Sequence, residues 1–336
     1  MSAIINITEQ LETSLILGAG SSFPLLENDP DVLDQLLHNT RSESTRRAYA
    51  RDLHDFFMFA SQQPPNQSLC LEFLHLEQGQ AIAVILKYKS HMVNTRKLAE
   101  NTVNRKLAAI RSLVAMGNRL GVCAYTISEH VKGEKIQRYR DTSGIQPFDY
   151  KKVLALVDRS TVKGKRDYAI LRLLWDNALR RNELVMLNVA DFDSTTATLS
   201  ILGKGKGSQK TQIKLTAQAT AAIVEYLLSE GRSSKLSDPL FQSCAYHRTN
   251  DGRLTGETVR ALIDNLCKEA GISKKMSPHR VRHSSITTAL EHSNGNYQKV
   301  QTLSRHASLD TIKIYDDNRQ RSLQQQELSN LLGDLI

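Results

Sequence analysis

The sequence has few of the residue patterns that mark metal-binding, redox or secreted proteins. It holds four cysteines, scattered as Cys70, Cys123, Cys244 and Cys267, and none of them forms a CxxC pair. This spacing gives no support for a zinc ribbon or a thiol redox motif, and it favours reduced thiols in a cytosolic protein. Aromatic residues make up 6% of the chain, with one tryptophan, so we expect a core built mainly from aliphatic side chains.

Long apolar runs and a signal peptide are also missing. No hydrophobic run is long enough to span a bilayer, and the first residues carry Glu9 and Glu12 without a basic start. The glycine-rich stretch at 203–207 lacks the Gly-Lys-Ser/Thr spacing of a nucleotide-binding P-loop, and we expect a strand after it where a P-loop needs a helix. These absences predict a cytoplasmic protein with no membrane partner and no P-loop nucleotide site.

Positive charge is what the sequence has in excess. The chain has 336 residues and a formal net charge of +9, from 44 Lys and Arg against 35 Asp and Glu. Its length exceeds that of a typical single domain, so two domains are expected. The charge is compatible with binding to nucleic acid, where basic side chains release counterions from phosphates. A solvated basic surface would have the same composition.

Hydrophobic periodicity divides the chain into two helical parts, the second interrupted by short strands. We therefore expect a mainly α fold with a small antiparallel β-sheet. The predicted strands cover 191–193, 197–202 and 209–215, and the last two predicted helices cover 308–315 and 319–333. The predicted organisation is an N-terminal extension (1–40), a helical domain (41–131), a charged linker (132–146), a second domain (147–318) and a C-terminal helix (319–336).

Four stretches of the second part carry the residue types that break a phosphodiester without a metal. That reaction needs an in-line nucleophile, cations around the phosphate oxygens and a proton donor for the leaving oxygen. The first stretch, ALRRNEL, offers Arg180, whose guanidinium can bind a phosphate through two hydrogen bonds, and Glu183, which can orient it. An exposed Arg–Glu pair on a surface helix is the ordinary alternative.

The second and third stretches supply a lysine and a histidine-rich helix. Lys204 lies at the tip of a predicted hairpin, from which it can enter a DNA groove as a proton donor, although a solvated basic hairpin would have the same sequence. Pro278 fits the first turn of a helix on which His279, Arg282 and His283 share a face. Two histidines four residues apart can also bind zinc, but no third ligand is apparent, so no metal site is predicted.

The fourth stretch, LSRHASLDTIKIY, contains His306 and Tyr315. A phenol is a weak nucleophile unless cations and a base surround it, and an isolated tyrosine is usually a packing or surface residue. The stronger signal is the order Arg, Lys, His-x-x-Arg, His, Tyr along one chain.

In this order and context the sequence resembles the tyrosine recombinase, or phage integrase, family. ALRRNEL is similar to the family's Gly-Leu-Arg-x-x-Glu-Leu box, PHRVRHSSITTAL to its His-x-Leu-Arg-His box and LSRHASLDTIKIY to its Leu-Gly-His…Thr…Tyr box. The resemblance covers 145–316 and reaches the first part, where SESTRRAYARDLHDFF and TVNRKLAAIRSL look like core-binding helices. Three residues depart from the family pattern: Ala178 and Arg305 each replace a usual Gly, and Val281 replaces a usual Leu.

The resemblance implies a helical core-binding (SAM-like) domain followed by an α+β catalytic domain that cleaves and rejoins DNA at specific sites. The reaction would pass through a 3′-phosphotyrosyl intermediate and need no cofactor. Tyr315 would be the nucleophile and Lys204 the proton donor to the leaving 5′-oxygen. The implied catalytic residues are Arg180, Lys204, His279, Arg282, His306 and Tyr315, supported by Glu183 and His283.

The resemblance also implies double-stranded DNA with paired half-sites as the partner, bound by a homo-tetramer in the nucleoid. Accessory DNA-bending or directionality factors would be further partners. The apolar stripe from Leu328 to Leu335 is expected to pack on a neighbouring copy, with packing on its own domain as the alternative. The candidate DNA contacts are Thr45, Arg47, Lys89, Arg105, Arg111, Lys206, Arg253, Thr258 and Arg260, although a basic helix face is often only solvated.

Two other functions fit part of the same pattern. A type IB topoisomerase uses the same phosphotyrosine chemistry, but the helical first domain and the spacing of the boxes favour a recombinase. A non-catalytic DNA-binding regulator descended from an integrase is the second alternative. All six catalytic positions carry the expected residue types, which argues against such a loss of activity.

Overall fold

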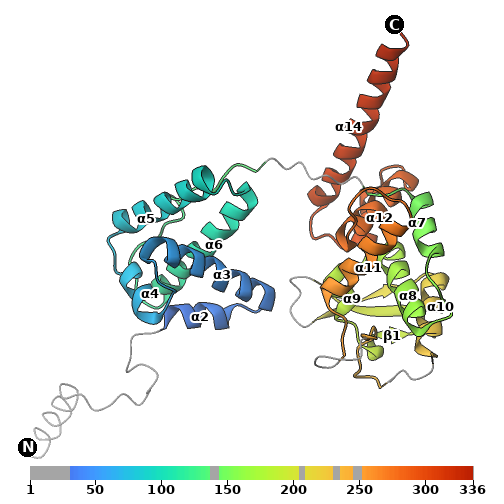
Figure 1. Ribbon diagram of the computed structural model, residues 1–336, viewed down its shortest axis with the longest axis horizontal. Helices are drawn as coiled ribbons and strands as arrows, with labels where there is room; N and C mark the ends of the chain where they lie inside the picture. The colour runs from blue at the N-terminus through green and yellow to red at the C-terminus, as the bar shows by residue number, and fades with distance from the viewer. Residues whose placement is uncertain (1–30, 137–143, 204–208, 230–234, 245–251, 336) are drawn as a thin grey trace, which may run out of the picture. The chain divides into compact units, whose positions relative to one another are not determined.

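Figure 1 shows the computed structural model of the protein, in which residues 31–136, 144–203, 209–229, 235–244 and 252–335 are described. The chain divides into two compact units, one ending at Arg138 and one beginning at Tyr139. Each unit has a hydrophobic core of its own. Residues 1–30 of the predicted extension and the candidate residues Lys204 and Lys206 lie outside the described residues.

The first unit is a bundle of helices. Its elements are α2 (Val32–Asn39), α3 (Glu43–Ser61), α4 (Gln67–Leu74), α5 (Gln78–Ser90), the π-helical turn η2 (His91–Thr95) and α6 (Glu100–Arg119). Ser42 caps the start of α3 and Asn66 caps the start of α4, each accepting a backbone N–H from the first turn. Val32 and Leu36 of α2 are buried in the core, so this helix, which falls within the predicted extension, packs as part of the bundle.

Aromatic side chains are scarce in the sequence, and four of them meet in the core of the first unit. The ring of Phe56 packs edge-on against those of Phe57 and Phe73, with centroids 5.2 Å apart, and against Tyr88 at 5.4 Å. The hydroxyl of Tyr88 donates a hydrogen bond of 2.6 Å to Asp55. These rings pack in a core whose other side chains are mostly aliphatic, as the composition led us to expect.

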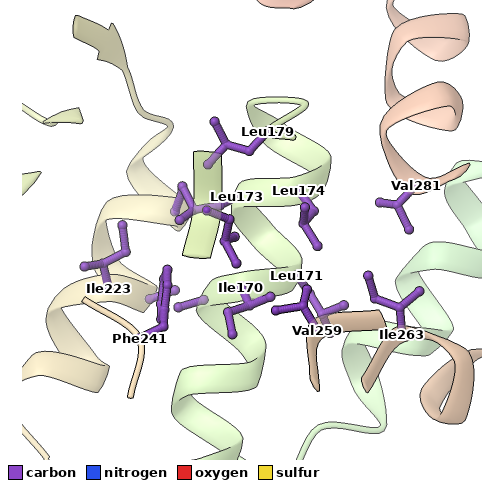
Figure 2. Close-up of a cluster of buried hydrophobic side chains, with 14 of the residues drawn as sticks. Ile170, Leu171, Leu173, Leu174, Leu179, Ile223, Phe241, Val259, Ile263 and Val281 are labelled. Atoms are coloured by element: carbon purple, nitrogen blue, oxygen red, sulfur yellow. The ribbon is translucent and has the colours of Figure 1, made fainter. Parts of the chain in front are cut away.

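The second unit is built around one buried helix, α8. The elements of this unit are α7 (Pro147–Ala155), α8 (Val162–Asp176), α9 (Arg181–Val185), the 3-10 turn η3 (Val189–Asp191), β1 (Phe192–Asp193), β2 (Thr198–Leu202), β3 (Lys210–Lys214), α10 (Ala217–Leu227), α11 (Gly256–Glu269), α12 (Pro278–His292), α13 (Tyr297–Ser304) and α14 (Leu309–Gly333). Figure 2 shows Ile170 and Leu173 of α8 beside Ile223 and Phe241, with Val259 on the other side of the helix.

The strands form the small antiparallel sheet that the sequence predicts, in the order β1-β2-β3. Leu199 of β2 pairs with Phe192 on one side and with Ile213 on the other. Leu199 and Ile201 are fully buried, so alternate residues of the central strand attach the sheet to the helical core. The prediction of a mainly helical fold with one small antiparallel sheet is confirmed.

The end of the chain differs from the prediction. Two separate helices were expected over 308–315 and 319–333, but α14 runs without a break from Leu309 to Gly333. No proline or glycine interrupts the segment before Gly333, so nothing in its backbone requires a turn. Figure 1 shows α14 extending from the second unit, with its far end away from α12.

Among the described residues, no single helix combines the length and the apolar character needed to cross a membrane. The pair formed by α4 and α5 with η2 meets the test of length and composition, but it is bent by 114°. Phe73, Ile85 and Tyr88 of this pair are buried in the core of the first unit.

We expect Leu174→Ala to destabilise the second unit by about 2–5 kcal/mol, because the substitution removes a fully buried side chain from α8 and leaves a cavity. The matched control is Leu228→Ala, at a side chain that is 79% exposed. It should leave the free energy of unfolding almost unchanged. Urea denaturation of both variants checks this, and equal losses would contradict the assignment of α8 as the centre of the core.

Candidate active site

Several helix ends of the second unit meet at one place. The end of α8 leads into α9 there, the first turns of α12 face them, and the junction of α13 with α14 lies against α12. The polar and ionisable side chains gathered at this place are Arg180, Glu183, His279, Arg282, His283, Arg305, His306 and Tyr315. All of the predicted catalytic and supporting residues except Lys204, which is outside the described residues, are therefore brought together.

Arg180 is held by a carboxylate at the start of α9. As the N-cap of that helix, Arg180 donates its backbone N–H to Glu183 at 2.8 Å and its Nη1 to the other oxygen of the same carboxylate at 2.6 Å. The side chain of Glu183 is 2% exposed and that of Arg180 is 27% exposed. Burial alone would raise the pKa of Glu183, but the charges of Arg305 and Arg180 and the hydrogen bonds from Arg180 hold it below its usual value.

The turn between α8 and α9 has an unusual backbone. Ala178 adopts a left-handed conformation with φ 46°, which ends α8 and directs Arg180 into the site. The carbonyl of Ala178 accepts hydrogen bonds from Nη1 of Arg282 and, at 3.2 Å, from Nη2 of Arg305. The helix α8 therefore ends at Asp176, just before this turn.

Arg282 is the most deeply placed of the cations, with 2% of the residue exposed. Besides Ala178, its guanidinium donates to the carbonyl of Ser304, and Nη2 lies 3.3 Å from Nε2 of His306. Burial, followed by the charges of Arg180 and Arg305, lowers the pKa of Arg282 to about 9. The guanidinium therefore stays charged at pH 7.

Two histidines and Tyr315 pack together on one side of α12. Ser277 caps this helix and Pro278 occupies its first turn, as the sequence predicts. Nε2 of His279 lies 2.8 Å from Nε2 of His283, so one of these nitrogens donates and the other accepts. The ring of His283 lies 4.7 Å from that of Tyr315 between centroids. Within the described residues, no group of three His, Cys, Asp or Glu side chains is placed to hold a metal ion.

Tyr315 is 4% exposed and is fixed by the first turns of α14. Ile312, one turn earlier, is fully buried. The next residue, Asp316, is also buried and accepts a hydrogen bond of 2.6 Å from the hydroxyl of Tyr297 in α13. The same chain that carries the cations therefore carries the tyrosine beside them.

His306 is neutral at pH 7. Burial, followed by the charges of Arg282, Arg180 and Arg305, lowers its pKa from 6.5 to about 4. Because Nη2 of Arg282 can only donate, Nε2 of His306 acts as the acceptor and the hydrogen resides on Nδ1. The ring centroid of His306 lies 5.9 Å from that of Tyr315.

The candidate DNA contacts of the first unit already have partners within the protein. Arg105 pairs with the buried carboxylate of Asp52, and Arg111 donates to a backbone carbonyl. Lys89 pairs with Glu134 at 2.7 Å, and Arg47 pairs with a glutamate on its own helix. Thr45 is partly exposed near the start of α3. Contact between these residues and DNA remains a prediction.

The candidate DNA contacts of the second unit differ from one another. Arg253 donates to the carbonyls of Val185 and Leu187 at 2.9 and 3.0 Å, which secures the turn after α9. This structural role was missed, because no local pattern shows which carbonyls a side chain reaches. Arg260 pairs with a glutamate of its own helix, α11, and Thr258 is exposed near the start of that helix.

The sequence analysis also missed Arg305, which it treated only as a departure from a family pattern. Its guanidinium is largely buried and donates to Glu183 at 3.1 Å, beside Arg180. The sequence signal for this residue was limited to a basic side chain directly before His306.

Both units match known families. The second unit matches the phage integrase family over residues 145–321, and the first matches the phage integrase N-terminal SAM-like domain over residues 33–119. A tyrosine recombinase of Synechocystis sp. is 45% identical over 307 residues, which are 91% of this chain and 96% of that protein. A tyrosine recombinase of Synechococcus elongatus is 44% identical over 292 residues, which are 87% of this chain and 90% of that protein.

Solved structures share the fold at lower identity. The XerH site-specific recombinase bound to a palindromic difH substrate has a TM-score of 0.60 at 19% identity, covering 88% of this chain and 83% of that one. A lambda integrase dimer bound to a COC′ core site has a TM-score of 0.59 at 15% identity, covering 94% of this chain and 87% of that one.

We expect the free energy of unfolding to fall as the pH drops from about 6.5 towards 4, because the pKa of His306 is depressed in the folded protein. In that window the unfolded chain binds a proton at this residue and the folded chain does not, so protonation favours unfolding. Above about 6.5 the contribution of His306 is complete. Urea denaturation at pH 7, 6 and 5 should show a weaker pH dependence for His306→Gln than for the native protein. An identical dependence would contradict the depressed pKa.

Proposed function

Because the chain belongs to the phage integrase family and is a site-specific tyrosine recombinase, we propose that Tyr315 is the nucleophile that attacks the scissile DNA phosphate. The phenolic oxygen forms a bond to phosphorus, the bond from phosphorus to the 5′-oxygen breaks, and a 3′-phosphotyrosyl intermediate results. A 5′-hydroxyl from a partner strand then attacks this intermediate and releases the tyrosine. The covalent bond conserves the energy of the phosphodiester, so the cycle needs no ATP.

The observation that carries this proposal is the position of Tyr315 beside the cationic cluster within one chain. The ring of Tyr315 packs on that of His283. It also lies near the ring of His306, and His306 in turn contacts Arg282. A phenol becomes a useful nucleophile when a base accepts its proton and nearby cations stabilise the phosphate that it attacks. The phenol, the cations and the imidazoles meet these requirements together.

The other roles follow from charge and accessibility. Arg180, Arg282 and His306 stabilise the charge that develops on the non-bridging phosphate oxygens in the transition state. Arg180 is the more accessible of the two arginines, since 27% of its side chain is exposed and Arg282 is 2% exposed. His279 exchanges a proton with the phenol, and Lys204 donates a proton to the leaving 5′-oxygen. Glu183 and His283 support the arrangement through the contacts described above.

The two alternative functions are not favoured. The relatives that cover most of the chain are named tyrosine recombinases, and none of those given above is named a topoisomerase or a regulator. Relaxation of supercoiled DNA without exchange between two sites would favour a topoisomerase.

We further propose that the protein acts on double-stranded DNA with paired half-sites, as a homo-tetramer in the nucleoid. Structural neighbours bound to DNA support the DNA partner. The far part of α14 supports self-association, because Leu328, Leu331 and Leu332 are 61%, 57% and 61% exposed and do not pack on their own unit. Leucines in such a row are suited to an apolar surface on another copy.

Tyr315→Phe should abolish covalent attachment to DNA and leave DNA binding largely intact, because the substitution removes only the phenolic oxygen. Duplexes that bind the variant can be selected from genomic fragments, sequenced, and then offered with a nick beside the cleavage position. Native protein should give a covalent adduct on a denaturing gel, and Tyr315→Phe should give none.

The matched control is Tyr168→Phe, at a tyrosine of α8 that stacks under Arg159 and lies outside the site. It should retain the adduct. An adduct that persists in Tyr315→Phe would refute the proposed nucleophile.

Replacing Leu328, Leu331 and Leu332 by Gln should leave binding to a single half-site intact and prevent assembly of the tetramer on paired sites. The reason is that these side chains are exposed in the isolated chain, so their replacement costs little stability but removes the apolar contact. Mobility shifts and sedimentation on half-site and full-site DNA measure both effects. Leu236→Gln, at a side chain 70% exposed, is the control, and unchanged assembly of the triple variant would defeat the proposal.

A further inference from the structure

Arg305 lies in the site, but the mechanism proposed above gives it no role. It ends α13 in the left-handed conformation, with φ 55°, where a residue with a Cβ is disfavoured and glycine is preferred. Ala178, on the opposite side of the site, has the same unusual conformation with φ 46°. Two turns of the site therefore hold residues with a Cβ in the left-handed region.

The side chain of Arg305 joins these two turns. Its guanidinium donates four hydrogen bonds: from Nη1 to the carbonyls of Asn177 at 3.0 Å and Leu303 at 2.6 Å, and from Nη2 to the carbonyl of Ala178 at 3.2 Å and the carboxylate of Glu183 at 3.1 Å. The guanidinium therefore bridges the α8–α9 turn and the end of α13. Only 14% of the side chain is exposed.

Each residue proposed to hold the phosphate is linked to Arg305, either by a shared hydrogen-bond partner or as its neighbour in the chain. Arg180 shares the carboxylate of Glu183, and its Nη2 also donates to the carbonyl of Arg305 at 3.3 Å. Arg282 shares the carbonyl of Ala178. His306 is the next residue in the chain, so the conformation of Arg305 sets the direction in which its side chain leaves the turn.

We propose that Arg305 is a positioning residue that fixes Arg180, Arg282 and His306 in the geometry required to bind the scissile phosphate. This inference rests on the proposed function of those three residues. Both terminal nitrogens of Arg305 are directed at carbonyls and at Glu183, and Nε is buried, so the guanidinium is turned into the protein. It acts through its neighbours and does not contact the DNA itself.

The charge of Glu183 gives Arg305 a second effect on Arg180. One buried carboxylate now serves two guanidinium groups, each bonded to it. Without Arg305, the carboxylate would be left with Arg180 as its cation, and the charge that Arg180 presents to a phosphate would be more fully neutralised. The loss of Arg305 should therefore weaken catalysis even where the backbone turn is preserved.

Arg305→Gly tests the inference, because glycine fits the left-handed turn while the whole side chain, guanidinium included, is removed. We expect the affinity for half-site DNA to stay near the native value. The rate of covalent adduct formation at saturating DNA should fall on the order of 10- to 100-fold, as is typical when a group that orients reactive side chains is lost. Melting curves confirm that both proteins are folded at the assay temperature.

Rescue experiments separate positioning from a general effect on stability. Added guanidinium ion at low, non-denaturing concentration should restore part of the rate of Arg305→Gly. Arg305→Lys keeps the charge but cannot make four forked contacts, so it should react at an intermediate rate. Should the glycine variant not fold, a reduced rate of the folded Lys variant serves as the test. Arg159→Gly is the control, since this arginine pairs with Glu225 outside the site, and it should show neither loss nor rescue.

Two outcomes would overturn the inference. A native rate of adduct formation in folded Arg305→Gly would show that the guanidinium does not position the site. A loss confined to DNA affinity, with a native rate at saturation, would show that Arg305 contacts DNA. Failure of the proposed function is distinguishable from both, because in that case the native protein itself forms no adduct.

Discussion

The site depends on the carboxylate of Glu183, which allows three guanidinium groups to lie together in a largely buried space. Arg180, Arg282 and Arg305 repel one another, and burial removes much of the water that would screen them. Glu183 bonds to two of the three and is itself buried. Three positive charges against one negative charge leave a local excess. The cluster is therefore electrostatically incomplete until an anion such as a phosphate binds.

The geometry of the cluster is set by helix ends. The last carbonyls of an α-helix have no partner within the helix and must be satisfied from elsewhere. After α8 and at the end of α13, guanidinium groups satisfy them, since Arg282 donates to Ala178 and Ser304, and Arg305 donates to Ala178 and Leu303. The same hydrogen bonds that satisfy these helix ends thus also orient the guanidinium groups.

Local periodicity predicted the helical class and the small sheet, and the resemblance to the tyrosine recombinase boxes predicted the set of residues that would meet. The sequence did not predict contacts between residues far apart in the chain. Arg105 and Arg253 are basic residues on exposed-looking segments, yet one pairs with buried Asp52 and the other with backbone carbonyls of a distant turn. The contacts of Arg305 were not predicted either, because Ala178 and Glu183 are also far from it in the chain. The continuous course of α14 was also missed, because a break was expected between 315 and 319, where nothing in the backbone requires a turn.

Because α14 is uninterrupted, a tilt of its first turns also moves its far end. The helix is attached to the second unit near its start, where Ile312 is buried and Asp316 accepts a hydrogen bond from Tyr297. Leu332 lies 17 residues beyond Tyr315 (332 − 315), a distance of about 25 Å at about 1.5 Å per residue. A tilt of about 10° at the tyrosine would move that end by about 4 Å. A displacement of the far end of α14 would therefore be transmitted to Tyr315 along one continuous helix, with no intervening loop.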